Sequence, residues 1–236
     1  MKSGPNKPIR LHLGCGSRYL NGYINVDLPQ HQRELIQGKV DVAADFRSLI
    51  YEPASVSEIR THHALEHFTR AGALKLLIQW RQWLEIGGTL HIETPDFDTA
   101  CWYYALSGKK ARAEISRHVF GSQEAPWANH YDGWGKRKYL FVLKKLGFTA
   151  LKFEKRSNSI STRFNSPLFN WLGLLVPNAL YRHFGMNKLP NITVIAKKSE
   201  RNIDERAAVA DILREYLVGT EGEALLTVWL EQIFEK

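Results

Sequence analysis

The chain has 236 residues, of which 44% are hydrophobic and 24% charged, values typical of a globular protein with a sizeable core. Its length suits one domain with an elaboration. It contains no apolar run of about 18 residues, which excludes a membrane-spanning helix, and its first residues lack the apolar segment of a secretion signal. We therefore expect a cytoplasmic protein with Cys15 and Cys101 as reduced thiols, not a disulfide scaffold.

The net charge of +8 is unevenly distributed along the chain. Residues 151–199 carry 8 basic and 1 acidic side chains, whereas residues 200–236 carry 4 and 9. The basic segment could face nucleic acid, an anionic membrane surface or a phosphate-bearing substrate. The acidic tail could fold back onto it.

Strand-like and helix-like segments alternate along the first part of the chain. Apolar, β-type runs predict strands over 9–13, 23–28, 40–44, 58–61, 89–93, 148–153 and 192–196. Helical periodicity predicts helices over 71–84, 96–106 and 136–146, with Gly87-Gly88 ending the first, Asp96 capping the second and Gly147 ending the third.

This alternation is typical of parallel β-α-β units. It predicts a Rossmann-like α/β fold with a mostly parallel seven-stranded sheet and helices on both faces. Ligands of such sheets bind beyond the carboxyl ends of the strands.

Two segments depart from the alternation. Residues 157–190, between the last two strands, are both basic and apolar, which suits a helical subdomain, an acceptor lid or a contact with anionic lipid. Residues 200–236 predict a helical tail with apolar stripes, docked on its own domain or on a second copy. We assign residues 1–199 to one domain and residues 200–236 to the tail.

The strongest motif is a glycine turn after the first strand. Gly14-Cys15-Gly16 lets the chain bend sharply and approach a ligand closely. Asp27 ends the next strand, where a carboxylate can accept hydrogen bonds from both ribose hydroxyls. Asp45 and Phe46 end the third strand, where a carboxylate beside an aromatic ring suits an adenine.

A dinucleotide would need a third glycine for its pyrophosphate, and that position holds the bulky Tyr19. The pattern therefore favours a nucleoside ligand without a pyrophosphate.

The segments LHLGCGSRYLNGYINVDL, VDVAADFRSL, THHALEHF and IGGTLHIETPDFD, in this order, resemble class I S-adenosylmethionine-dependent methyltransferases. More narrowly, they resemble the small enzymes associated with bacterial surface-polysaccharide and cell-wall biosynthesis. The resemblance covers about residues 9–155 and 191–198. It implies that Gly14, Cys15 and Gly16 line the methionine and ribose portion, that Asp27 holds the ribose, and that Asp45 and Phe46 hold the adenine.

One position departs from the family pattern. Many relatives carry an acidic residue two positions before the first glycine, where it orients the methionine amine, and this chain has His12 there. We expect backbone carbonyls or water to hold the amine instead.

The segment from His62 to His67 is rich in polar side chains. His63-x-x-Glu66-His67 matches a zinc-peptidase pattern, but no long helix precedes it and no third ligand is apparent. The methyltransferase resemblance instead implies that this loop lines the methyl-transfer pocket, with His62 and His63 near the cofactor. Glu66 and His67 are expected to be structural, and no metal is expected.

Residues 117–134 are too polar and aromatic for a plain connection. We predict that they arch over the site and bind a saccharide, with Trp127, Tyr131 and Trp134 stacking on the sugar and His118 and Asp132 bonding its hydroxyls. His130 is the first choice for the general base, His63 the second and His118 the third.

We therefore predict transfer of a methyl group from S-adenosylmethionine to a hydroxyl of a saccharide or glycolipid-linked intermediate, with peripheral membrane contact and homodimerisation left open. The alternatives are an RNA or small-molecule methyltransferase, and a non-catalytic scaffold that keeps the fold.

Overall fold

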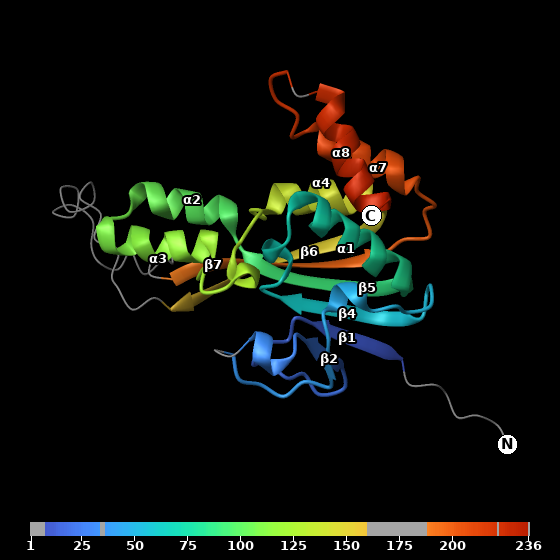
Figure 1. Ribbon diagram of the computed structural model, residues 1–236, viewed down its shortest axis with the longest axis horizontal. Helices are drawn as coiled ribbons and strands as arrows, with labels where there is room; N and C mark the ends of the chain where they lie inside the picture. Colours follow the sequence, from blue (N-terminus) through green and yellow to red (C-terminus); the bar gives the residue numbers. More distant parts are fainter. Residues whose placement is uncertain (1–7, 34–35, 160–187, 221, 236) are drawn as a thin grey trace.

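The computed structural model describes residues 8–33, 36–159, 188–220 and 222–235. Its centre is one seven-stranded sheet with the strand order β3-β2-β1-β4-β5-β7-β6 (Figure 1). The strands are β1 (Ile9–Leu13), β2 (Ile24–Asp27), β3 (Val42–Ala43), β4 (Val56–His62), β5 (Leu84–Pro95), β6 (Phe148–Ser159) and β7 (Lys188–Lys198).

The sheet confirms the predicted fold class. Strands β1 to β5 pair in parallel, and β7 is antiparallel to both of its neighbours. The order runs outward from β1 in one direction and from β4 in the other, so a topological switch point lies between these two strands. The chain has a Rossmann-like α/β fold with a mostly parallel seven-stranded sheet.

The helices are α1 (Arg70–Trp83), α2 (Phe97–Leu106), α3 (Lys109–Phe120), α4 (Lys136–Lys145), α7 (Glu205–Arg214) and α8 (Gly222–Phe234). Short helical turns occur at η1 (Gln30–Gln32), η2 (Phe46–Ser48), η3 (Leu65–His67) and η4 (Pro126–Ala128). The side chains of Thr69, Asp96 and Asp204 accept hydrogen bonds from the first turns of α1, α2 and α7 and so fix where these helices begin.

Three differences from the predicted elements exceed two residues. Helix α1 ends at Trp83 and β5 begins at Leu84, so Gly87 and Gly88 lie inside the strand and do not end the helix. Helix α3 was not predicted, and it includes the first residues of the segment 117–134 that we assigned to a loop. Strands β6 and β7 are longer than predicted because they pair with each other from Phe148 to Ser159, beyond their apolar stretches.

One face of the sheet forms the apolar core. Register and alternation place the following side chains on this face, all of them fully buried: Leu11, Leu13, Ile59, Leu90, Ile92 and Val194. Thr94 shares the face and hydrogen-bonds Tyr139 of α4, with 2.9 Å between their hydroxyl oxygens. Trp80 of α1 belongs to the same core cluster. Helices α1 and α4 therefore cover this face.

The opposite face carries polar side chains along the same strands. They are Arg10, His12, Asn25, Glu58, Arg60, His62, His91, Glu93 and Thr193. The described connection from β1 to β2, residues 14–23, contains no helix. Hydrogen bonds between polar groups, and not apolar packing, therefore organise this face.

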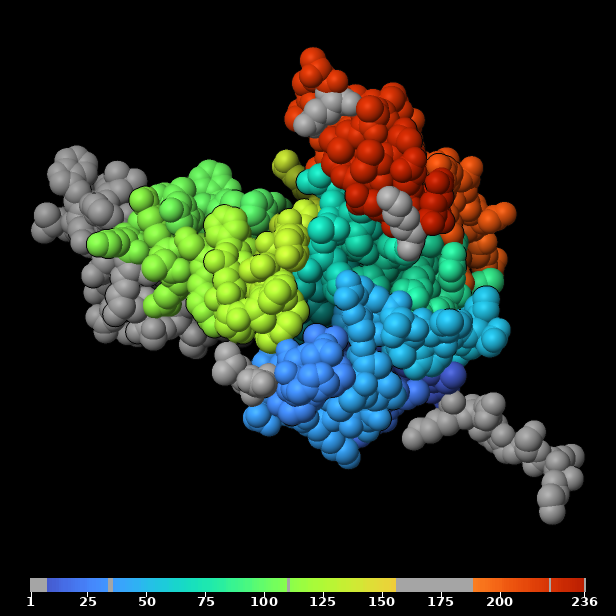
Figure 2. Space-filling model, viewed as in Figure 1, coloured from blue at the N-terminus to red at the C-terminus, as the bar shows by residue number. Residues whose placement is uncertain are grey.

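The C-terminal helices pack on their own domain, one of the two arrangements expected for the tail. Helix α8 contacts α1, and α7 contacts α4. Figure 2 shows this tail, in red, seated over α1 and away from the lobe that α2 and α3 form. The Arg70 guanidinium lies 3.7 Å from the centre of the Tyr216 ring and 5.4 Å from that of Trp229, so cation–π contacts fasten α1 to the tail.

Most of the basic segment 157–190 lies outside the described residues. Within the part of the chain that the structure describes, no helix is long and apolar enough to cross a membrane.

Tail docking predicts a contrast between two neighbours on α8. Leu226 is 2% exposed and Val228 is 47% exposed. Leu226→Ala is expected to lower the free energy of unfolding by roughly 2–5 kcal/mol because it opens a cavity against the domain. Val228→Ala is expected to stay within about 0.5 kcal/mol of the parent. Urea unfolding measures both, and equal effects would contradict a docked α8.

Candidate functional site

The glycine turn at the end of β1 has the backbone that its sequence predicts. Gly14 has φ 66° and Gly16 has φ 55°, in the left-handed region that favours glycine. A Cβ on Gly14 would lie 2.9 Å from the Cβ of Ala64, in the segment that follows β4. The turn therefore passes close beside the end of β4, at the switch point of the sheet.

Asp27, at the end of β2, is linked to this turn. Its carboxylate accepts hydrogen bonds from the backbone N–H of Gly16 at 2.5 Å and of Leu28 at 2.7 Å. Its backbone carbonyl accepts from the N–H of Ala44, which follows β3. The carboxyl ends of β1, β2 and β3 thus meet at one edge of the sheet.

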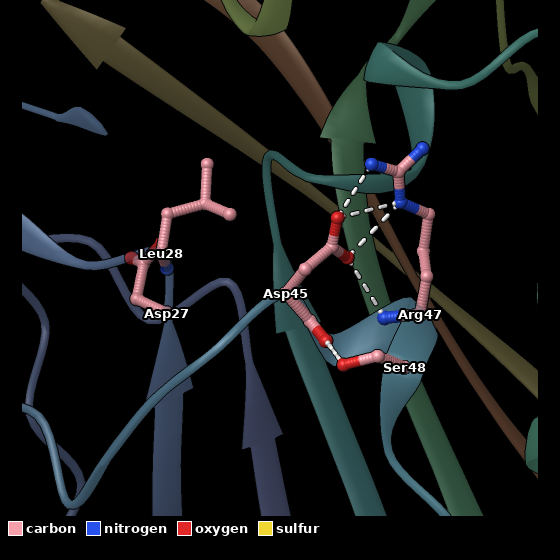
Figure 3. A network of polar contacts seen from close by, with 5 residues as sticks. All are labelled: Asp27, Leu28, Asp45, Arg47 and Ser48. Atoms are coloured by element: carbon pink, nitrogen blue, oxygen red, sulfur yellow. Dashed lines mark hydrogen bonds and ion pairs between the residues drawn. The ribbon is translucent and has the colours of Figure 1, made fainter.

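Asp45 faces Arg47 at the same edge (Figure 3). The Arg47 guanidinium donates to both carboxylate oxygens, with Nε at 3.0 and 2.8 Å, and the Arg47 backbone N–H donates at 2.9 Å. Burial alone would raise the pKa of Asp45, but these hydrogen bonds keep that pKa below its ordinary value. Asp45 is therefore an ionised acceptor that holds the Arg47 guanidinium at the ligand edge.

Two predicted cofactor contacts belong to the interior. Phe46 is 8% exposed and packs against Phe68 and Trp80, with ring centres 5.6 and 6.2 Å away, which leaves little ring surface for an adenine. Cys15 is 3% exposed, and burial raises the pKa of its thiol to about 11. Both side chains therefore pack inside the protein and present little surface to a cofactor.

His12 and His62 form a buried pair on the polar face. His12 Nδ1 lies 3.0 Å from Asn25 Oδ1, and His12 Nε2 lies 2.9 Å from His62 Nδ1. Burial lowers the pKa of both rings, that of His62 to about 3, so both are neutral at pH 7. Both ring nitrogens of His12 have partners. His12 therefore has no free ring nitrogen with which to orient the methionine amine, as the acidic residue of the family pattern does. The Nδ1 atom of His62 is likewise occupied by its contact with His12.

His63 sits between two carboxylates after β4. Its Nδ1 is 3.2 Å from Glu66 Oε1 and its Nε2 is 3.6 Å from Glu93 Oε1. Burial alone would lower the pKa of His63. The two carboxylates outweigh this effect and raise the pKa to about 10. The ring is therefore protonated at pH 7. As a cation it orients the Glu66 and Glu93 carboxylates. A protonated ring cannot accept a proton, so the prediction of His63 as the second-choice base is not supported at neutral pH.

Glu66 joins η3 to the predicted acceptor loop. Its backbone carbonyl accepts from the Tyr131 N–H at 2.8 Å, and the rings of His67 and His130 lie edge to face with centres 4.6 Å apart. Burial lowers the pKa of His130 to about 4, so the ring is neutral at pH 7. Its Nδ1 is buried and has no hydrogen-bond partner among the described residues. An unpaired ring nitrogen of this kind is what a base or a ligand atom requires.

Several predicted acceptor contacts are structural. Trp134 is 2% exposed and stacks on Tyr139 with ring centres 4.8 Å apart, so it cannot stack on a sugar. Asp132 pairs with Lys138, and His118 Nε2 donates to the Pro190 carbonyl at 2.9 Å.

Two predicted acceptor contacts keep accessible surface. Tyr131 is 55% exposed, and Trp127, on η4, is partly buried.

A cavity of about 870 Å³ lies beside this loop. Asp45, Arg47, His67 and Tyr131 line it together with residues of α1 and α8. Asp45 thus lines the same cavity as Tyr131, which belongs to the loop predicted to hold the acceptor. Among the described residues, the glycine turn and Asp27 are not part of this lining.

The sequence does not reveal the neighbours of Glu66, His67 and Arg47. His130, which lies beside Glu66 and His67, is more than sixty residues away in the chain. Arg47, two residues after Asp45, could have been recognised as its ion-pair partner from the spacing.

Comparison with known proteins gives similarities in structure alone. No family model matches the chain, and no curated protein matches it. An S-adenosylmethionine-dependent methyltransferase from Archaeoglobus fulgidus is 18% identical, with a TM-score of 0.49, over 81% of this chain and 86% of that one. One from Methanosarcina mazei is 15% identical, with a TM-score of 0.48, over 84% and 95%.

Phosphoethanolamine N-methyltransferase 2 from Haemonchus contortus, in complex with S-adenosylmethionine, is 13% identical, with a TM-score of 0.44, over 84% of this chain and 50% of that one. Similarities of this size carry no conclusion about ligand or activity. Any proposal about the ligand or the activity therefore rests on the strand order, on the glycine turn and on the polar groups at the carboxyl ends of β1, β2 and β3.

The neutral His62 predicts acid sensitivity. The ordinary pKa of 6.5 applies to the unfolded chain and a pKa of about 3 to the folded one, so stability is complete above pH 6.5 and is lost as the pH falls toward 3. Between pH 7 and pH 4.5, the free energy of unfolding of His62→Asn is expected to fall by about 2 kcal/mol less than that of the parent. Urea unfolding at both pH values measures this. The exposed His31→Asn serves as the control, and an equal loss in parent and His62→Asn would contradict the assignment.

Proposed function

We propose that this chain transfers a methyl group from S-adenosylmethionine to an oxygen of a saccharide or glycolipid-linked acceptor. The observation that carries the proposal is the meeting of the Gly14–Gly16 turn, Asp27 and Asp45 at the carboxyl edge of β1, β2 and β3. Parallel sheets of this topology bind ligands at this edge.

The residues at this edge fit the parts of the cofactor. A carboxylate has about four lone-pair positions. Two on Asp27 are used by the backbone of Gly16 and Leu28, which leaves two for ribose hydroxyls. Asp45 can accept the exocyclic amine of an adenine in exchange for a bond to Arg47. The cofactor supplies the electrophilic methyl group when bound.

The acceptor is assigned to the cavity that Tyr131 and His67 line. An exposed aromatic ring such as that of Tyr131 can stack on the apolar face of a sugar. A sugar hydroxyl is a weak nucleophile at neutral pH, and a positioned base contributes about 10²–10⁴-fold. We assign the base to His130, whose Nδ1 lone pair is free and whose ring is neutral at pH 7. His63 orients Glu66 from the other side.

Cofactor binding is tested by calorimetry with S-adenosylhomocysteine. Asp27→Asn is expected to weaken binding roughly 10–150-fold, because hydrogen bonds to a charged group contribute about 1.5–3 kcal/mol. Glu52→Gln, which neutralises a carboxylate outside the site, is expected to bind like the parent. A parent protein that takes up no ligand at millimolar concentration would instead support a non-catalytic scaffold.

Catalysis is tested by turnover with methyl-labelled cofactor. Cell-envelope glycans, RNA and small metabolites are offered in parallel, and the glycan fraction is expected to carry the label. Label in RNA or in small metabolites alone would refute the saccharide assignment.

His130→Ala is expected to lower turnover 10²–10⁴-fold while S-adenosylhomocysteine binds as in the parent. Turnover within a few-fold of the parent would remove His130 from the mechanism.

A further inference from the structure

Three potential metal-binding side chains converge beside the cavity. Glu66 and His67 come from η3, and His130 follows η4. One ligand atom from each of the three lies within 4.8 Å of the others. The hydrogen bond from the Tyr131 N–H to the Glu66 carbonyl holds the two segments together.

Two of these three side chains have a buried polar atom without a partner among the described residues. Glu66 is 2% exposed, and its Oε2 has no hydrogen bond to the described part of the chain. His130 Nδ1 is buried and likewise has none there. A buried polar atom without a partner costs about 1–3 kcal/mol, so native proteins seldom keep two in one place. The two lone pairs therefore indicate a partner that the described part of the chain does not supply.

The remaining polar atoms of these side chains are already held. His67 Nδ1 lies 3.1 Å from the Asn129 carbonyl oxygen, which leaves Nε2 as its free atom. The Val119 backbone interacts with the His130 ring and raises its pKa. Glu66 Oε1 accepts from His63 Nδ1 at 3.2 Å. Metal-binding histidines typically donate their second ring N–H to a carbonyl or carboxylate in this way.

We propose that Glu66 Oε2, His67 Nε2 and His130 Nδ1 bind one divalent transition-metal ion, of which Zn²⁺ is the representative. Two imidazoles and one carboxylate are a known ligand set for zinc with an open fourth position. Bonds of 2.0–2.2 Å place tetrahedral ligand atoms roughly 3.4 Å apart. In this structure one ligand atom of each of the three side chains lies within 4.8 Å of the others, so a modest rearrangement of the side chains closes the site.

One of the three proposed ligands, His67, borders the cavity assigned to the acceptor. His67 and Tyr131 line the cavity of about 870 Å³. This role rests on the proposed function. An acceptor hydroxyl bound to the ion would lose its proton to water more readily. Its oxygen would then bond the methyl carbon while the sulfonium sulfur keeps the C–S electron pair. In the metal-loaded protein the His130 lone pair holds the ion, so the ion replaces the free base.

The test uses full-length protein without an affinity tag, stripped with chelator and titrated with Zn²⁺ by calorimetry and with Co²⁺ by visible absorption. One ion per chain is expected, with a tetrahedral Co²⁺ spectrum. Glu66→Gln and His67→Gln are each expected to weaken binding at least tenfold. The partly exposed His67 gives a second variant should the buried Glu66→Gln not fold. His31→Ala, which removes an exposed histidine elsewhere, is expected to bind like the parent.

Each outcome decides one of the two proposals. Binding that is absent, or unchanged in folded His67→Gln, overturns the metal site. S-adenosylhomocysteine binding to the stripped protein is measured separately. If the ion binds and this ligand does not, the proposed methyl transfer fails and the metal site stands. If turnover in stripped protein equals that of the loaded protein, the ion has no part in catalysis.

Discussion

The ion cluster around His63 holds the carboxyl edge of the sheet in place. His63 takes up φ 51°, an uncommon value for a residue with a side chain, and its backbone N–H donates to the Glu93 carbonyl of β5 at 2.8 Å. Its ring lies between Glu66 and Glu93. The chain therefore leaves β4 in a direction that carries Glu66 and His67 toward the cavity. Without the two carboxylates, nothing in these contacts would offset the uncommon backbone angle or the partly buried imidazolium.

The two faces of the sheet use different kinds of interaction. The face under α1 and α4 is apolar and tolerates only side chains that fit its packing. The other face holds a hydrogen-bonded chain from Asp41 through Asn25 and His12 to His62. If Asn25 Oδ1 accepts from His12 Nδ1, then His12 Nε2 accepts from His62 Nδ1, and the tautomers of both rings are fixed. A polar network of this kind sets the register of β1, β2 and β4 more strictly than apolar contacts do.

The sequence predicted the sheet well because alternation of apolar segments is a local signal. The strands at 9–13 and 24–27, helix α4 and the Asp96 cap all follow from neighbouring residues. Helix α3 was missed because its sequence is polar and its apolar contacts come from α2, which no local pattern reveals. Trp134 was misassigned for the same reason, because only the stacked Tyr139 shows that it is buried. The convergence of His130 with Glu66 depends on tertiary folding alone.

Arg47 links the stability of the edge to the binding of a ligand there. Its ion pair with Asp45 is partly exposed, with side chains 63% and 32% accessible, and such pairs contribute only about 0–1 kcal/mol. A ligand amine can therefore replace the guanidinium on Asp45 at little cost. The Arg47 side chain lines the cavity to which we assign the acceptor. Arg47 thus keeps the pKa of Asp45 low and borders both the proposed adenine contact and the proposed acceptor cavity, so one side chain joins the two halves of the proposed site.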